Sequence, residues 1–223
     1  MTIETLSIGR LSILIIILLG CSKPPEKYFE GILTYKIYNK TEGYPDDQPF
    51  GTELKVFLKE GQLKRVYNTT QQGGIREELY NSELGVVFMK IVGSDTILRA
   101  DVTRNPYHSL INMETRSTQK TFLNQECRVL EMNTIHKNGD LEFPWDLEFY
   151  YSDTLRVNPN LFEDWRFGFY NKGIKEMGAY YLKLIEKSPA TYTEYEIIDI
   201  QPQALNDSLF EVDSSKVITD FQW

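Results

Sequence analysis

Two carboxylates on one predicted strand are the nearest approach in this chain to a catalytic pair. Asp146 and Glu148 are separated by one residue, and apolar residues alternate with them over 145–151. On an extended strand this spacing puts both carboxylates on one face, about 7 Å apart, a separation that glycosidases use. An acidic solvent face opposite an apolar core face gives the same pattern. A glycan hydrolase is therefore a distant alternative.

The histidines and one of the cysteines give no stronger signal. The chain has 2 histidines, His108 and His136, and no glycine-rich phosphate loop, nucleophile elbow, paired CxxC or HExxH motif accompanies them. Ser109 adjoins His108, but adjacent residues do not face each other on a helix, so a triad is not expected. Cys127 lies in a strand-like alternation and should behave as a small buried hydrophobe. We expect no catalytic residues, no cofactor and no metal ion.

The other cysteine, Cys21, follows the most apolar segment of the chain. Arg10 is the only cation before an apolar run over 11–19, and polar residues follow the cysteine over 22–25. This layout is typical of a secretory signal. The run is about half of the roughly 20 residues that a spanning helix needs. A simple uncleaved membrane anchor is the alternative.

Residues 18–21, Leu-Leu-Gly-Cys, resemble the bacterial lipobox. The resemblance implies a lipoprotein signal peptide over 1–20, acylation of Cys21 with chains such as palmitate, and a polar linker over 21–27. More than one acyl chain gives stable membrane anchoring. Ser22, where retained lipoproteins carry Asp, implies sorting to the bacterial outer membrane, at its periplasmic face or the cell surface.

Charge and length limit the partners. The chain has 223 residues, with 24 Lys and Arg against 32 Asp and Glu, a net charge of -8. Removing residues 1–20 takes away one Glu and one Arg, so the charge is unchanged. Such an acidic chain has little to hold a phosphate backbone, so nucleic acid is not an expected partner. The length after processing suits one domain.

The rest of the chain alternates with period two, which is typical of strands. A hairpin is predicted over 54–67, where Leu63, Arg65 and Tyr67 share one face and a turn falls at Glu60-Gly61. We predict about ten antiparallel strands in meander order, more than a flat sheet carries comfortably. The expected fold is mainly β (α+β): a strongly curved antiparallel sheet or half-barrel. It forms a single domain over 28–213, followed by a C-terminal tail over 214–223.

Two segments carry helix signals instead. Asn105-Pro106 and Asn158-Pro159 each place a capping residue before a first-turn proline. After the second pair, Leu161, Phe162, Trp165 and Phe169 recur near one helical face. We expect one or two short helices that act as a lid over the curved sheet.

Four segments resemble an uncharacterised family of secreted and lipid-anchored bacterial proteins: 56–66, 123–129, 155–159 and 205–212. The fold of that family is similar to the outer-membrane lipoprotein carriers LolA and LolB. The resemblance implies a half-barrel with helices as a lid over an apolar cavity, and it supplies no catalytic residues. Gln125 and Glu126 depart from the family, where a glycine usually precedes the cysteine strand.

Two functions of different classes follow. The first is a binding module that is held to the membrane by its lipid and takes an apolar ligand, such as an acyl chain, or a lipoprotein. It needs a cavity of about 300 Å³ or more, with these lining residues: Leu33, Tyr35, Leu54, Val56, Leu58 and Trp165. The alternative is a structural or accessory subunit of an envelope complex, whose outer surface contacts a partner protein.

Overall fold

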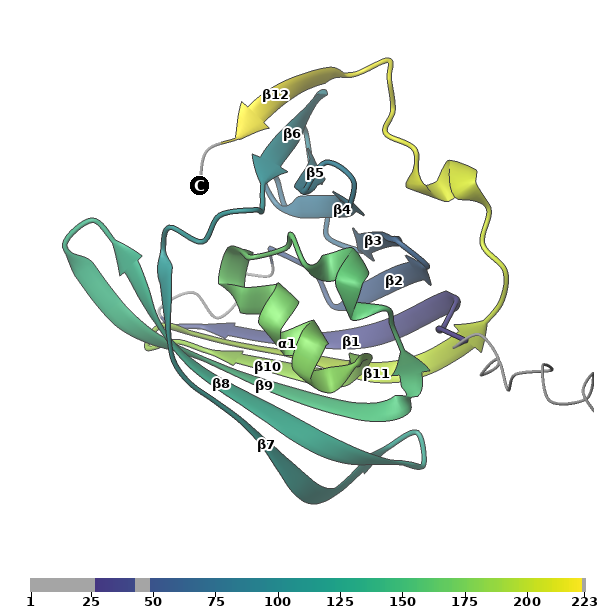
Figure 1. The fold of residues 1–223 in the computed structure, drawn as a ribbon. Helices are drawn as coiled ribbons and strands as arrows, with labels where there is room; N and C mark the ends of the chain where they lie inside the picture. The colour runs from purple at the N-terminus through teal and green to yellow at the C-terminus, as the bar shows by residue number, and fades with distance from the viewer. Residues whose placement is uncertain (1–26, 43–48, 222–223) are drawn as a thin grey trace, which may run out of the picture.

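A single curved sheet forms most of the structure (Figure 1). The computed structural model describes residues 27–42 and 49–221. Its strands are β1 (Gly31–Thr41), β2 (Glu53–Lys59), β3 (Gln62–Tyr67), β4 (Ile75–Asn81), β5 (Val86–Ile91), β6 (Thr96–Asp101), β7 (His108–Phe122), β8 (Gln125–Asn138), β9 (Leu141–Arg156), β10 (Ala179–Lys187), β11 (Thr191–Pro202) and β12 (Val217–Phe221). The helical segments are η2 (Pro159–Phe162), η3 (Phe167–Phe169), α1 (Tyr170–Met177) and η4 (Asp207–Phe210).

The sheet consists of two meanders that meet in its middle. The order of the 12 strands in the described residues is β12-β6-β5-β4-β3-β2-β1-β11-β10-β9-β8-β7. Neighbouring strands are antiparallel, except that β12 runs parallel to β6. The protein is thus mainly β, as predicted, with a mixed sheet that does not close into a barrel. The strand missed from the sequence is β12, which lies in the segment predicted as a tail.

The connection between β6 and β7 explains why the sheet curves. β6 is second and β7 is twelfth in the order, so ten inter-strand spacings of about 4.8 Å would separate them by about 48 Å in a flat sheet. The connection over 102–107 reaches at most about 25 Å from the end of β6 to the start of β7. The sheet must therefore bend until these strands approach each other, and Figure 1 shows the connection crossing the open side.

The main core lies on the concave face, where α1 packs (Figure 1). The hairpin of β2 and β3 is as predicted, with Gly61 at φ 76° in its turn. Helix α1 packs against β8 at Gly173, where an added Cβ would make an ordinary van der Waals contact with the sulfur of Met132 at 3.5 Å. Buried Ile174 and Met177 fix the same face of the helix to the sheet.

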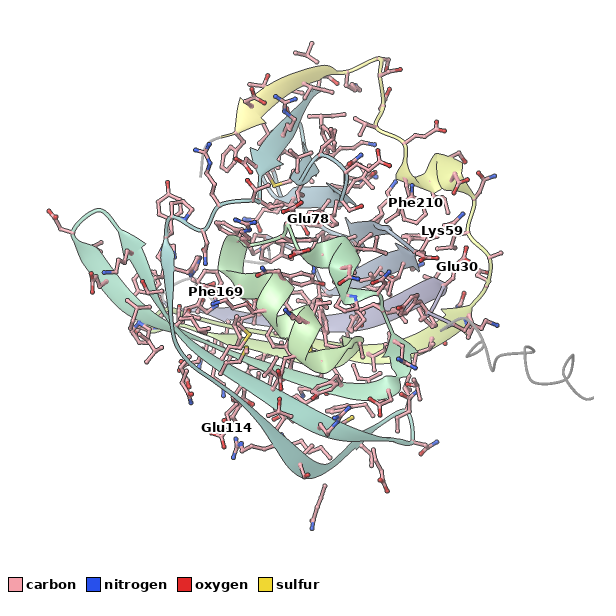
Figure 2. The ribbon with its side chains drawn as sticks, viewed as in Figure 1. Glu30, Lys59, Glu78, Glu114, Phe169 and Phe210 are labelled. Carbon is pink, nitrogen blue, oxygen red and sulfur yellow. The ribbon has the colours of Figure 1, made fainter. Side chains whose placement is uncertain are left out.

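A second, smaller core lies on the convex face. Leu205 and Phe210 come from the segment after β11 and cover Leu79, Phe88 and Ile97 of strands β4 to β6. Figure 2 shows Phe210 on this returning segment. The chain then enters β12, which is held by ion pairs from Arg99 to Asp220 (2.7 Å) and from Lys216 to Asp95 (2.8 Å).

The helix predicted after Asn105-Pro106 is wrong, because β7 begins at His108 and pairs with β8. Tertiary pairing overrides a weak local signal there. The signal at Asn158-Pro159 is confirmed as a short 3-10 turn, η2, at whose start the Asn158 side chain accepts from the Asn160 N–H. The expected helical face through Trp165 is not formed, because η2 ends at Phe162. Regular α-helix begins only at Tyr170, after Gly168 and Phe169, which take left-handed φ values of 61° and 59°.

The structure does not describe the residues of the predicted membrane anchor. The predicted signal peptide over 1–20 and the lipidation site Cys21 fall outside the described residues. Across 27–42 and 49–221, none of the helices combines the length and the apolar character needed to cross a bilayer.

The second core should contribute measurably to stability. Phe210→Ala leaves a cavity against β4 to β6 and should lower the free energy of unfolding by about 3 kcal/mol. Val217→Ala, at a position 68% exposed on β12, is the matched control and should change it by less than about 0.5 kcal/mol. Urea unfolding measures both, and equal losses would show that the returning segment is not packed as described.

Candidate functional site

A cavity of about 180 Å³ lies inside the curve of the sheet. Strands β3 and β4 line one side, β9, β10 and β11 line the other, and the segment over 165–170 covers it. The volume is below the 300 Å³ expected, yet exceeds the roughly 150 Å³ that suffices for benzene. Charged and aromatic side chains share the lining, so the cavity is not uniformly apolar.

A buried ion pair forms one wall. Arg65 on β3 and Glu78 on β4 are directly opposed in the sheet, and their side chains are only 13% and 16% exposed. Nη1 of Arg65 lies 3.4 Å from Oε2 of Glu78, and the Tyr67 hydroxyl donates to the same oxygen at 3.0 Å. Figure 2 shows Glu78 near β4, above the helical segment.

The remaining guanidinium donors reach two further elements. Nη2 of Arg65 donates to the hydroxyl of Tyr170 on α1 at 3.2 Å and to that of Tyr180 on β10 at 3.3 Å. The guanidinium carbon also lies 5.3 Å from the Trp165 ring and 5.4 Å from the Tyr170 ring, within range for a cation–π contact. One side chain thus joins both meanders and the covering segment.

The covering segment is anchored to the β6–β7 connection. The N–H groups of Arg166 and Phe167 both donate to the carbonyl of Val102, at 2.8 and 3.1 Å. The Gly168 N–H donates to the Asn105 side chain at 3.3 Å. Left-handed backbone at Phe169 is strained for a bulky side chain. These bonds hold the strained turn and set Trp165 and Phe167 over the cavity.

Glu186 on β10 is the second acid in the lining. No side-chain hydrogen bond or ion pair reaches it from residues 27–42 or 49–221, whereas Glu78 has both Arg65 and Tyr67. Burial, opposed by Arg65, raises the pKa of Glu186 to about 7. Near neutral pH its carboxyl therefore exchanges between the ionised and protonated forms.

The two histidines lie together, and His108 of this pair lines the cavity. His108 and His136 are paired across β7 and β8, and Nε2 of the first lies 3.4 Å from Nδ1 of the second. The His108 ring packs at 4.8 Å from the Trp145 ring and 5.4 Å from the Phe167 ring. Burial, with a smaller effect of His136, lowers the pKa of His108 to about 4, so this ring is neutral at pH 7.

The predicted lining residues divide into two groups. Trp165 lines the cavity. The other five side chains are at most 2% exposed and pack into the main core instead of facing the cavity: Leu33, Tyr35, Leu54, Val56 and Leu58. They lie on β1 and β2, where they are part of the main core.

The acidic pair on β9 lies away from the cavity. Trp145, Leu147 and Phe149 of this strand line it, so the alternating acids point to the convex face. Asp146 accepts from the Asn133 side chain at 2.9 Å. Burial raises the pKa of Glu148, but hydrogen bonds from Lys187 and Tyr150 outweigh it and lower that pKa. A lowered pKa keeps the Glu148 carboxylate ionised at neutral pH, so it is not suited to act as a general acid.

The free cysteine behaves as predicted. Cys127 is buried, and burial raises the pKa of its thiol. Among the described residues, no group of three or more His, Cys, Asp or Glu side chains is placed to hold a metal ion.

Sequence reasoning missed Arg65, Glu78 and Glu186 as site residues. A usable signal was present for Arg65, because it interrupts the apolar face that Leu63 and Tyr67 define on a predicted hairpin. A charge on a core face requires a buried partner. The partners themselves come from other strands and from α1, which the sequence does not identify.

The chain was compared with known families, curated proteins and solved structures. No family model and no curated protein matches it. Among solved structures, it is similar to an uncharacterized conserved protein from Thermus thermophilus. The TM-score is 0.40 at 6% identity, covering 86% of this chain and 91% of that chain. This likeness supports no functional argument.

The Arg65–Glu78 pair should be energetically coupled. Arg65→Met leaves a buried carboxylate without its cation and should cost about 3–5 kcal/mol of unfolding free energy. Glu78→Gln alone should cost about 2 kcal/mol. The double variant should lose at least about 1 kcal/mol less than the two single losses together. Urea unfolding of the four proteins measures this, and strict additivity would contradict the pair.

Proposed function

We propose that this protein is a lipid-anchored binding module of the bacterial outer membrane that holds a small ligand inside its half-barrel. The cavity under residues 165–170 carries the proposal. Protein interiors are otherwise close-packed, so an unfilled space lined by three charged side chains and several aromatic rings is best explained by a ligand. The half-barrel with a helical cover also agrees with the proposed relationship to lipoprotein carriers.

The size of the cavity narrows the ligand. Pockets that enclose a drug-sized molecule have about 300–1,000 Å³, so 180 Å³ favours a molecule of about ten non-hydrogen atoms over a whole acyl chain. The charged lining argues against a purely apolar occupant as well, because Arg65, Glu78 and Glu186 gain nothing from contact with hydrocarbon. The proposed ligand is accordingly small and carries a polar group.

The accessory-subunit alternative is supported by a different feature. β12 ends the sheet, and Val217, Ile218 and Phe221 are exposed along it. An edge strand with exposed apolar side chains can pair with a strand of another protein. This edge and the cavity lie on separate parts of the molecule, so experiments can distinguish the two functions.

A cavity-filling variant tests the binding module. Leu184 lines the cavity, and the larger ring of Leu184→Phe should narrow the cavity and weaken ligand binding. Ile198→Phe adds the same bulk at a position of β11 that is 48% exposed and is the control. Full-length protein purified from its host is denatured, and the released small molecules are identified by mass spectrometry. Wild type and the control should release a compound that Leu184→Phe lacks; identical profiles would favour the accessory subunit.

The anchor is tested separately. Cys21→Ser removes the thiol that the lipobox presents for acylation, so the variant should carry no fatty acid and should keep residues 1–20, because the lipoprotein signal peptidase cuts after acylation. Cys127→Ser, at the buried cysteine, should be acylated and cleaved like the wild type. Intact-mass analysis of the membrane fraction measures both. A wild type that keeps residues 1–20 and carries no fatty acid would show that the apolar segment acts as an uncleaved anchor.

A further inference from the structure

The unpaired acid in the cavity indicates what the ligand supplies. Glu78 is neutralised by Arg65 at 3.4 Å, whereas Glu186 has no partner of its own among the described residues. Glu186 is only partly exposed, and an ionised carboxylate in such a site carries a desolvation cost until a cation or hydrogen-bond donor reaches it. A ligand that brings a positive charge would relieve this cost, and a ligand that brings a negative charge would increase it.

The charges that face Glu186 leave the cavity acidic. Arg65 and Glu78 cancel, and the His108 ring is neutral at pH 7 because burial lowers its pKa to about 4. Burial also raises the pKa values of the surrounding hydroxyls well above their ordinary value, so these stay uncharged: Tyr67 on β3, Tyr170 on α1, and Tyr181 and Tyr195 on β10 and β11. The net charge of the lining is therefore that of the Glu186 carboxylate.

The walls suit a cation with an apolar body. Trp145 and Phe149 of β9 and Phe167 of the covering segment line the same space. Aromatic faces attract ammonium groups, and carboxylate with aromatic walls is a recurring way to recognise organic amines. The volume of about 180 Å³ can hold one ring with a short side chain, and a longer molecule would not fit.

We propose that the cavity binds a free organic ammonium ion with a small aromatic or apolar body, whose charged group lies against Glu186. This inference rests on the proposed binding function and names the chemical class of its ligand. Arg65 contributes by keeping Glu78 occupied and by holding Trp165 and Tyr170 in place over the bound ring.

Binding should then depend on pH in a defined direction. A primary amine stays protonated well above pH 8, so over pH 6 to 8 the changing group is Glu186, whose pKa is about 7. The carboxylate form, which attracts the ammonium, increases as pH rises. Affinity for the amine should therefore increase by about tenfold from pH 6 to pH 8.

Matched probes test the inference on the full chain in non-ionic detergent. Isothermal titration calorimetry compares phenethylamine with 2-phenylethanol, which has the same shape without the charge, and with 3-phenylpropionate, which has the opposite charge. At pH 8 the amine should bind at least about tenfold more tightly than the alcohol, and the propionate should bind most weakly. Titration of each probe into detergent alone supplies the blank.

Two variants locate the charge. Glu186→Gln should remove both the preference for the amine and its pH dependence. Glu196→Gln is the control, because that side chain lies on the convex face, paired with Lys183 at 2.8 Å, and should keep wild-type behaviour. The comparison of probes on the wild type remains decisive if Glu186→Gln does not fold.

Each result has a distinct meaning. Equal binding of the alcohol and the amine, or tighter binding of the propionate, would overturn the ammonium assignment and leave the binding module intact. Binding of none of the three probes would overturn the assignment, and the release experiment with Leu184→Phe would then decide the binding function independently. If Glu196→Gln lost the preference for the amine, the carboxylate that attracts the ammonium would lie on the convex face, and the inference would also be overturned.

Discussion

The short connection between β6 and β7 is the constraint on which the rest of the structure depends. It forces two strands from opposite ends of the sheet order to approach each other, so the sheet curves into a half-barrel with an interior. The same connection accepts hydrogen bonds through the Val102 carbonyl and the Asn105 side chain from the segment over 165–170. Curvature and cover are therefore set together, and the cavity exists because both are present.

Inside this frame, Arg65 does most of the positioning. Its guanidinium contacts Glu78 on the neighbouring strand, Tyr180 across the half-barrel and Tyr170 on α1. A buried ion pair is seldom the most stable choice for a core, and it is more simply explained by the shape and charge that it gives the cavity. Because Glu78 is the carboxylate that is bonded to Arg65, Glu186 remains as the group whose charge is available to a ligand.

Local patterns predicted the strands better than the site. Period-two alternation identifies the hairpin of β2 and β3 because each strand has one buried face, and it placed Arg65 on that face. Its partners Glu78, Tyr170 and Tyr180 lie 13, 105 and 115 residues away, beyond the reach of local patterns. The same capping signal occurs at Asn105 and Asn158. The first precedes a strand, because β7 begins at His108 and pairs with β8, whereas the second precedes the short helix η2. The edge strand β12 was missed since five exposed residues carry no alternation of burial.

The convex and concave faces of the sheet illustrate how similar side chains take different roles. Glu148 and Glu194 on the convex face form ion pairs with Lys187 and Lys183, which is ordinary surface pairing of modest energy, whereas Glu186 on the concave face has no such partner among the described residues.

The direct test is the titration of the Glu186 carboxyl by ¹³C NMR in the full chain, assigned by its loss in Glu186→Gln. The account predicts a titration near pH 7, raised from the ordinary 4.5, that moves lower when phenethylamine is added. A titration at the ordinary value, unaffected by the amine, would contradict it.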